Sequence, residues 1–258
     1  MTAPARVAQS VEQLTRNEQV ASSILASGSA CHSKSVDRSA LGRPRLCVPA
    51  YFGPWERDHW ERLIADRPST VVINPDSGPG VYEHDGYGEL VEQLSANGTS
   101  VLGYVATSYL AKPLDSCVDE AVRYNRWYGV HGIFWDEFPR RNAYRAVRTL
   151  HAAALRPAAR VAGVRCVFNA GGMVPKGWML ASPGAMWVTF EGSAAAYSER
   201  VNDRRADMLH RQCHLVYECA DLPPRFPHGL GGAYATSDRL PNPWDVYESV
   251  TAARCARR

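Results

Sequence analysis

From Leu46 onward, short apolar segments alternate with segments of helical periodicity, and this alternation limits the folds that the chain can adopt. Buried strands are mostly apolar because unpaired charge is costly to desolvate. We expect strands at residues 46–51, 69–74, 100–106, 131–136, 164–169, 185–190, 213–218 and 231–236. Helical patterns lie between most of them, at residues 56–66, 87–97, 116–129, 142–157, 195–212 and 244–254.

Eight strand–helix units over residues 46–258 predict an α/β fold with a single (β/α)8 barrel, the TIM barrel, as catalytic domain. A doubly wound open sheet is the alternative, but it usually has fewer strands. Asn97-Gly98 should close the second helix, and Asp115 can cap the third. Only a Pro-rich turn, 222–227, separates the last two strands, so we expect the final units to be degenerate.

Residues 1–45 form an N-terminal extension with six Lys or Arg residues against three acids, which accounts for the whole net charge of +3. We expect this extension to be flexible, with at most a weak helix around 7–26 and a linker at 27–44. The remaining chain is neutral overall. A neutral body argues against a nucleic-acid partner, which would require a clustered basic face.

The sequence shows neither a secretory signal nor a membrane span. A signal peptide needs a continuous apolar core of ~7–15 residues, and a span needs ~18–20. We therefore expect a cytoplasmic protein without a membrane partner, or a secreted one if the N-terminus is truncated. Seven cysteines without a CxxC motif indicate buried thiols in a reducing compartment, and a Cys213–Cys219 disulfide is the alternative.

Carboxylates stand where two of the predicted strands end. HGIFWDEF, residues 131–138, runs from apolar residues into Asp136 and Glu137, and AMWVTFEG, residues 185–192, runs into Glu191. Active sites of (β/α)8 barrels lie at these strand ends. One carboxylate from each of two strands is what acid/base chemistry on a glycosidic bond requires.

We predict a separate role for each acid. Neighbours on a regular strand point to opposite faces, so we expect Asp136 to point inward as nucleophile or charge stabiliser. Glu137 would then be a supporting or substrate-binding acid, and Glu191 the general acid/base. The alternative is that the three acids form structural ion pairs with arginines, for which the candidates are Arg140, Arg141 and Arg165.

Polar and aromatic residues near the other strand ends are candidates for substrate binding. Sugars present CH faces that stack on aromatic rings, while their hydroxyl groups need polar partners. NPDSGPG, residues 74–80, predicts a rigid loop that presents Asn74, although a plain turn fits the spacing equally well. The candidates are Tyr51, Asn74, Tyr104, Tyr109, Asn169 and Asp238.

Motifs for other chemistries are missing. The histidines are scattered, and His210 and His214 lack the glutamate of HExxH, so we expect no metal. No GxSxG nucleophile motif occurs, and neither GxGxxG nor a phosphate-loop lysine is present. We expect no cofactor.

Several of these segments, in order over residues 46–250, resemble the spherulin-4 (spherulation-specific) family: VPAYFGP, VVINPDSGPG, LGYVATSY, GIFWDEF, Asn169-Ala170-Gly171, VTFEG and YATSDRLPNPWD. The resemblance implies a glycoside hydrolase barrel acting on α-linked N-acetylgalactosamine or galactosamine polymers. It assigns Asp136 as nucleophile, Glu191 as acid/base and Glu137 as an essential neighbour. The expected partner is a carbohydrate or a glycosylated small molecule.

Two other functions remain open at this point. A cytoplasmic tailoring enzyme, a cyclase or lyase, could use the same carboxylates for proton transfer on the same barrel. A carbohydrate-binding protein without catalysis is the third reading, although retention of all three acids argues against it.

Overall fold

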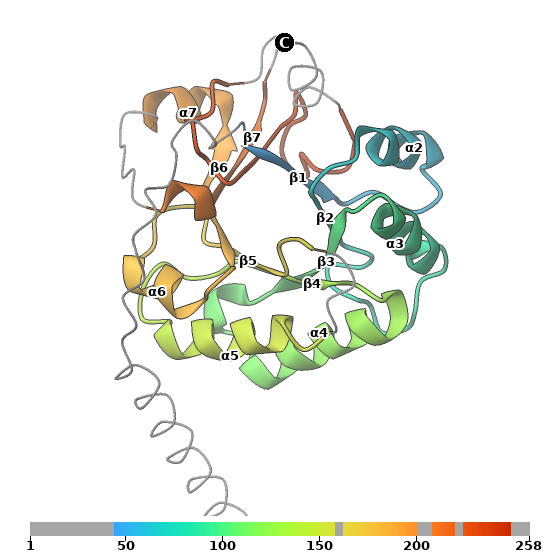
Figure 1. The fold of residues 1–258 in the computed structure, drawn as a ribbon, viewed down its shortest axis with the longest axis horizontal. Helices are drawn as coiled ribbons and strands as arrows, with labels where there is room; N and C mark the ends of the chain where they lie inside the picture. Colours follow the sequence, from blue (N-terminus) through green and yellow to red (C-terminus); the bar gives the residue numbers. More distant parts are fainter. Residues whose placement is uncertain (1–43, 158–161, 201–207, 220–223, 249–258) are drawn as a thin grey trace, which may run out of the picture. The chain divides into compact units, whose positions relative to one another are not determined.

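A closed barrel of eight parallel strands forms the centre of the computed structural model, which describes residues 44–157, 162–200, 208–219 and 224–248 (Figure 1). Each strand pairs with the next in chain order, and β8 closes the ring onto β1. The predicted (β/α)8 barrel is confirmed, and the open sheet is wrong. The strands are β1 Arg45–Ala50, β2 Thr70–Ile73, β3 Ser100–Ala106, β4 Gly132–Asp136, β5 Cys166–Asn169, β6 Met186–Ser193, β7 Gln212–Tyr217 and β8 Gly232–Ala235.

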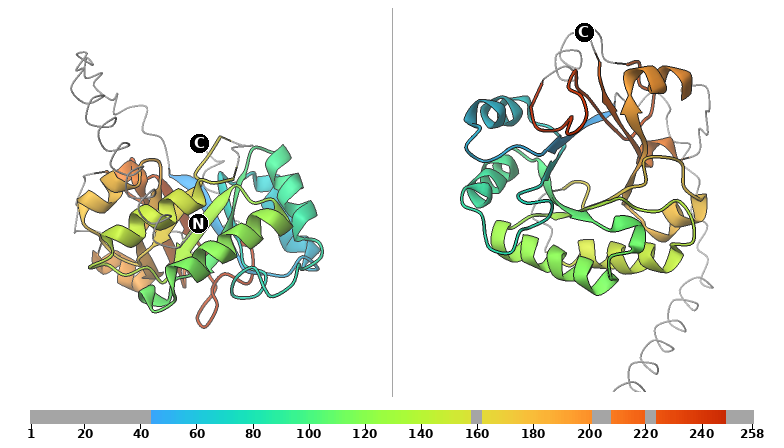
Figure 2. Two further views of the ribbon diagram at one scale, coloured as in Figure 1. Left: turned by 90° about the horizontal axis from the view of Figure 1, so that it is seen from below. Right: turned by 180° about the vertical axis from the view of Figure 1, so that it is seen from behind.

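Helices cover the outside of the ring, as views from opposite sides show (Figures 1 and 2). They are α2 Arg57–Asp66, α3 Tyr87–Ala96, α4 Leu114–Tyr128, α5 Tyr144–Ala154, α6 Lys176–Ala181 and α7 Ala194–Arg200, with short 3-10 turns η2 Ser108–Leu110 and η3 Leu209–Arg211. Among the described residues between β7 and β8, and after β8, no helix occurs, in agreement with the predicted degeneracy of the last units. No helix in the described ranges is long and apolar enough to cross a membrane.

Some helix predictions need correction. α4 begins after Pro113 without a side-chain cap, and Asp115 lies in its first turn instead. Of the helix expected over 195–212, residues 195–200 belong to α7, residues 201–207 lie outside the described residues, and residues 208–212 are a turn, η3 and the start of β7. The C-terminal end of α3 at Asn97 is as predicted.

Two further differences concern the second half of the chain. α6 was not predicted, because the glycines and prolines around this six-residue helix interrupt its helical pattern. The helix expected over 244–254 does not form at 244–248, which are turn and bend, and its remainder lies outside the described residues. The helix and linker expected within 1–43 also lie outside them.

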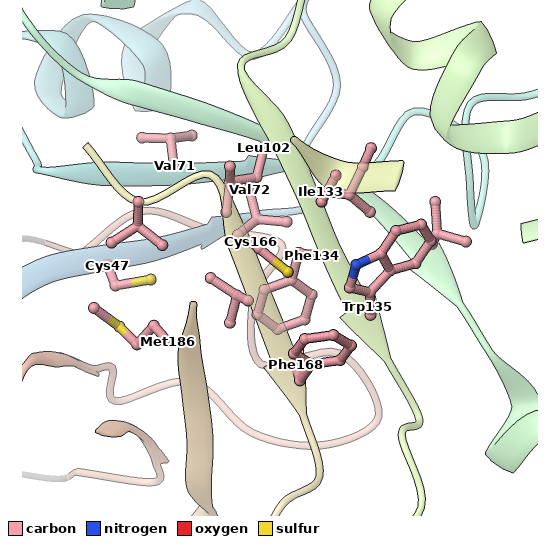
Figure 3. Packing of buried hydrophobic residues seen from close by; sticks show 14 of the residues in the cluster. Cys47, Val71, Val72, Leu102, Ile133, Phe134, Trp135, Cys166, Phe168 and Met186 are labelled. Carbon is pink, nitrogen blue, oxygen red and sulfur yellow. The ribbon is translucent and has the colours of Figure 1, made fainter. Parts of the chain in front are cut away.

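The strand side chains form the core on both sides of the barrel wall. Phe134 and Trp135 follow each other in β4 and point to opposite sides of it, so Phe134 packs inside the ring and Trp135 outside (Figure 3). Burying a side chain of this size contributes about 1.5–3 kcal/mol. The five described cysteines are buried and free, so Cys213 and Cys219 form no disulfide; Cys31 and Cys255 lie outside the described residues.

A bulge in β6 decides which way Glu191 points. Val188 pairs with Cys213, but Phe190 already pairs with His214, which leaves Thr189 as an extra residue. Paired residues of parallel strands face the same side of a sheet. Because of the extra residue, Glu191 points to the inside of the barrel, as Val188 does, whereas simple alternation would turn it outward.

Candidate active site

Asp136, Asn169 and Glu191 meet at the carboxyl ends of three neighbouring strands, β4, β5 and β6. Nδ2 of Asn169 donates to Oδ1 of Asp136 at 2.7 Å and to Oε2 of Glu191 at 2.6 Å. Because one nitrogen contacts both oxygens, the oxygens are no farther apart than the sum of these two distances. The barrel thus brings together the two acids expected from the sequence, with the side chain of Asn169 between them.

The amide of Asn169 is itself held in one orientation. Its side chain is buried, and its Oδ1 accepts a hydrogen bond from the backbone nitrogen of Gly171 at 3.0 Å. This contact fixes which end of the amide faces the carboxylates. Asn169 therefore presents a donor, not an acceptor, to both acids.

Asp136 lies in a partly buried position with several hydrogen-bond donors. Burial raises the pKa of its carboxyl group, and the charge of Glu137 adds to this in the same direction. Hydrogen bonds from the backbone nitrogen of Glu137, from the Tyr104 hydroxyl and from Asn169 favour the ionised form and oppose the rise. Three donors thus converge on the group expected to act as an anion.

Glu191 also has an environment that favours its protonated form. Burial raises its pKa, and the nearby charge of Asp136 raises it further. Only two side chains oppose this rise, Asn169 and the indole of Trp244, which both donate to the carboxylate. Neighbouring carboxyl groups whose surroundings separate their pKa values take different roles, one as acid and one as anion. Here Asp136 receives three hydrogen-bond donors and Glu191 two, while the pKa of both groups is raised.

Trp244 is a site residue that the sequence did not single out. It is buried in the segment after β8, and its carbonyl oxygen accepts a hydrogen bond from the backbone nitrogen of Tyr51 at 2.9 Å. The contact links the end of β1 to the segment that supplies the donor for Glu191. The only signal in the sequence was the motif YATSDRLPNPWD, to which Trp244 belongs.

Tyr51 and Tyr104 form an aromatic wall beside the two acids. Their rings meet edge to face with centroids 5.4 Å apart. The pKa of each hydroxyl is raised, first by burial and then by the charge of Asp136, with a smaller contribution from Glu191. Both phenols therefore stay protonated and lie beside the two acids, and their role in substrate binding stays a prediction.

Glu137 follows Asp136 at the point where the regular strand β4 ends. Its φ of 49° lies in the left-handed region, so the alternation of a regular strand does not apply to its side chain. The carbonyl oxygen of Glu137 accepts hydrogen bonds from the backbone nitrogen of Tyr109 and from Oγ1 of Thr107, each at 2.8 Å. Thr107 is fully buried and also contacts the carbonyl oxygen of Asp136 through its own backbone nitrogen and hydroxyl.

The strain at this point extends to the facing loop. Ser108, Tyr109 and Leu110 have φ values of 48°, 53° and 69°, so three successive residues other than glycine adopt the left-handed conformation opposite Glu137. Conformations of this kind cost about 1–3 kcal/mol each and concentrate at functional sites. Thr107, at the start of this segment, holds both strand ends together.

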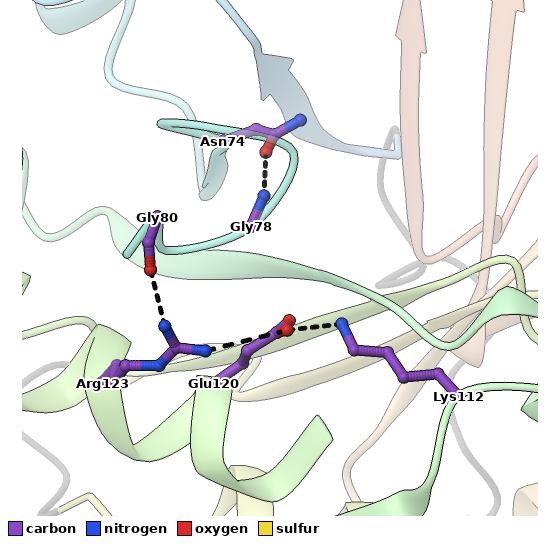
Figure 4. Close-up of polar contacts among 6 residues, drawn as sticks. All are labelled: Asn74, Gly78, Gly80, Lys112, Glu120 and Arg123. Atoms are coloured by element: carbon purple, nitrogen blue, oxygen red, sulfur yellow. Dashed lines mark hydrogen bonds and ion pairs between the residues drawn. The ribbon is translucent and has the colours of Figure 1, made fainter. Parts of the chain in front are cut away.

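Asn74 has a structural contact in its loop. Its Oδ1 accepts a hydrogen bond from the backbone nitrogen of Gly78 at 2.8 Å (Figure 4). Arg123 of α4 donates to the carbonyl oxygen of Gly80 at 2.6 Å and lies near Glu120, which pairs with Lys112. These contacts hold the loop in one conformation against α4, and its rigidity stays a prediction. Among the described residues, Asn74 forms no hydrogen bond with the two acids, so its role in substrate binding stays a prediction.

Tyr109 and Asp238 are not brought into the group around Asp136. The side chain of Tyr109 is 69% exposed, which places it at the rim. Asp238 lies after β8 and forms a hydrogen bond with Asp245. The pKa of Asp245 is raised, first by burial and then by this contact with Asp238. Both residues remain candidates for more distant parts of a substrate.

The alternative of structural ion pairs finds no support among the described residues. The ion pairs there are Lys112–Glu120 and Arg123–Glu120. Arg165 instead donates to backbone oxygens, including that of His131 at 3.3 Å. Within the described ranges, no group of three or more His, Cys, Asp or Glu residues is placed to hold a metal ion.

Comparison with known proteins gives a family match and one curated relative. Residues 45–252 match the family described as spherulation-specific family 4. Spherulin-4 from Physarum polycephalum is 33% identical over 99 residues, which cover 36% of this chain and 29% of that protein. The alignment therefore spans less than a third of the relative's length.

Solved structures with a similar arrangement are more distant. The C-terminal domain of a protein titled putative chitinase from Desulfitobacterium hafniense has a TM-score of 0.37 at 11% identity, covering 68% of this chain and 67% of that one. An α-galactosidase from Thermus thermophilus has a TM-score of 0.40 at 13% identity, covering 84% and 62%. A β-mannanase from Streptomyces thermolilacinus has a TM-score of 0.40 at 14% identity, covering 79% and 82%.

Proposed function

The chain belongs to spherulation-specific family 4, and from the chemistry of its site we propose that it is a retaining glycoside hydrolase. The single observation that supports this most is the contact of one amide nitrogen of Asn169 with both Asp136 and Glu191. Retaining glycosidases hold their two carboxyl groups about 5–5.5 Å apart, and inverting ones about 6.5–9.5 Å. Oxygens that share a hydrogen-bond donor fit the shorter separation.

The roles of the acids follow from their surroundings. Asp136 attacks the anomeric carbon and forms a glycosyl ester, while the bond to the leaving oxygen breaks and Glu191 gives that oxygen its proton. In the second step Glu191 takes a proton from water, the water oxygen attacks the anomeric carbon, and the ester bond to Asp136 breaks. Both acids return to their starting states.

The proposed substrate is an α-linked amino-sugar glycan, such as a polymer of N-acetylgalactosamine or galactosamine. The motifs shared with the spherulin-4 family support this choice. Tyr51 and Tyr104 supply aromatic surface beside the acids for a sugar ring. Glu137, one residue beyond the nucleophile, is proposed to bind substrate hydroxyl or amide groups.

The direct test is hydrolysis of α-1,4-linked N-acetylgalactosamine and galactosamine oligomers, followed by release of reducing ends. We expect Asp136→Asn to abolish turnover and Glu191→Gln to reduce it by about 10²–10⁴-fold. Glu92→Gln, an exposed acid on α3, is the matched control and should retain full activity. NMR of the first product should show the α-anomer.

Two further results separate this proposal from its competitors. A substrate with an activated leaving group should leave a glycosyl adduct on Asp136, detectable by mass spectrometry of the peptide. Azide should partly restore the activity of Glu191→Ala, because it can attack the glycosyl ester without a general base. Full activity in Asp136→Asn, or a β-anomer as first product, would contradict the assignment.

A further inference from the structure

The acids of this chain are distributed very unevenly around the barrel. Between Glu137 and Glu191 there is no Asp or Glu residue in the sequence, although this stretch contains eight Lys or Arg residues. It spans the loop after β4, α5, β5, α6 and most of β6. Residues 46–258 are neutral overall, so the balancing negative charge lies on the rest of the barrel. The basic residues of a chain that is neutral over residues 46–258 are thus concentrated in this stretch.

Part of this basic stretch lines two hollows beside the candidate active site. The larger has a volume of about 950 Å³, and Arg140, Arg141 and Arg145 line it together with Tyr144 and Trp178. The smaller, of about 500 Å³, shares Arg140 and Arg141 with it. Both volumes lie within the range of about 300–1,000 Å³ of ligand pockets.

The smaller hollow borders the residues that hold the two acids. Its lining includes Phe138, Ala170 and Tyr109. Phe138 follows Glu137 in the chain, Ala170 follows Asn169, and the backbone nitrogen of Tyr109 donates to the carbonyl oxygen of Glu137. The smaller hollow therefore lies next to residues that adjoin Glu137 and Asn169.

Among the described residues, the arginines there have no carboxylate partner. Neither hollow is lined by an Asp or Glu residue, and among the described residues Arg140, Arg141 and Arg145 form no ion pair. All three side chains are exposed. The first turn of α5, which contains Arg145, also lacks an acid and a side-chain cap, so its backbone nitrogens add positive potential.

We propose that these hollows bind the negatively charged groups of an acidic glycan, carboxylate or sulfate, that extends from the active site. Arginine pairs with such groups through two parallel hydrogen bonds, and the neighbouring tyrosines offer surfaces for the sugar rings between them. This inference rests on the proposed hydrolase function and narrows its substrate. A chain of free amino sugars is positively charged and is repelled here, so of the two polymers proposed above the N-acetylated one is favoured, and acidic groups that it carries bind to the arginines.

Binding can be measured separately from hydrolysis. Titration calorimetry would compare three hexasaccharides: chondroitin 4-sulfate, neutral N-acetylgalactosamine, and its de-N-acetylated form. We expect chondroitin 4-sulfate to bind most tightly and the de-N-acetylated chain most weakly. Arg140→Gln/Arg141→Gln should weaken chondroitin binding by about tenfold or more, and higher salt should reduce the difference between the proteins.

Two control variants keep the result specific. Arg57→Gln/Arg126→Gln removes the same charge from exposed positions on α2 and α4, outside both hollows, and should bind as the wild type does. Arg140→Lys/Arg141→Lys keeps the charge and should recover only part of the affinity, because lysine lacks the paired donors. Circular dichroism would establish that each variant is folded.

Several outcomes would overturn the inference. Equal binding of the neutral or de-N-acetylated chain, binding unaffected by Arg140→Gln/Arg141→Gln, or no binding of chondroitin 4-sulfate would each do so. Tighter arginine-dependent binding of a single-stranded DNA 20-mer would identify a nucleic-acid site instead. Arginine-dependent chondroitin binding without hydrolysis of any chain would reject the hydrolase and keep the acidic-glycan site. Hydrolysis that Arg140→Gln/Arg141→Gln leaves unchanged, without arginine-dependent binding, would keep the hydrolase and reject the acidic-glycan site.

Discussion

The hydroxyl of Tyr104 donates a hydrogen bond to the carboxylate of Asp136, and this contact joins β3 to β4 at the mouth of the barrel. The donor favours the ionised carboxylate against the effect of burial, which raises its pKa. A phenol that stays protonated can support the anion throughout the working range of pH.

Tyr104→Phe should therefore reduce kcat/KM by about 10- to 100-fold, the range expected for losing a hydrogen bond to a charged group. The ring remains and still meets Tyr51 and Phe134, so thermal stability should change little. Without the donor, the pKa of Asp136 rises further, and the acidic limb of the pH profile of kcat/KM should move to higher pH. Tyr82→Phe, at an exposed position, is the control.

Asn169→Ala should affect both limbs of that profile. Its Nδ2 lowers the pKa of Asp136 and of Glu191, so removing it raises both values. The whole bell-shaped profile should shift to higher pH, and the maximum of kcat/KM should fall by about 10²-fold. An unshifted profile would mean that Asn169 does not donate to these acids in solution. Asn125→Ala, in α4, should leave the profile unchanged.

Trp244→Phe should act on one limb alone. The indole donates to Glu191 and lowers its pKa, while no such contact to Asp136 is present among the described interactions. We expect the alkaline limb, which reports deprotonation of the acid, to move to higher pH while the acidic limb stays in place. A shift of both limbs would show that the indole acts on the pair rather than on Glu191.

Stability should depend on pH in the opposite sense to that of ion-paired carboxylates. Burial raises the pKa of folded Glu191, so between its ordinary pKa and the raised value the folded state binds more protons than the unfolded state. The free energy of unfolding therefore falls as pH rises through this window. Glu191→Gln removes the free-energy cost of burying an ionised carboxylate. The variant should therefore be more stable than the wild type at pH 7, but not at a pH below the ordinary pKa of a glutamate. Urea unfolding at both pH values measures this, with Glu92→Gln showing no difference.

Thr107 tests the link between the strained segments. Its buried hydroxyl donates to the carbonyl oxygens of Asp136 and Glu137 at 3.0 and 2.8 Å. Thr107→Val keeps the shape but leaves these oxygens with fewer donors, at a cost of about 1–3 kcal/mol in the free energy of unfolding. Activity should also fall, because Glu137 loses part of its support. A stable variant with normal kcat would show that the hydroxyl is not needed there.

The strands and the main acids could be predicted because burial selects apolar residues and leaves carboxylates at strand ends. The direction of Glu191 could not, since alternation along β6 points it outward and only the bulge at Thr189 reverses this. Trp244 was missed because it acts from a segment without regular structure, far along the chain from Glu191. Asn74 stood out by composition, yet its visible contact is within its own loop.

The bulge in β6 also affects how this strand should be compared with those of relatives. In a regular strand, the residue number tells which face of the sheet a side chain occupies. The extra residue Thr189 shifts this relation by one residue for the rest of β6. Two relatives whose β6 segments differ in length by one residue, one with the bulge and one without, can both direct an acid inward. Two relatives with β6 segments of equal length can direct it to opposite sides. Residues beyond Val188 are therefore better matched between relatives by the β7 residue with which they pair, such as Leu215 for Glu191, than by counting residues along the chain.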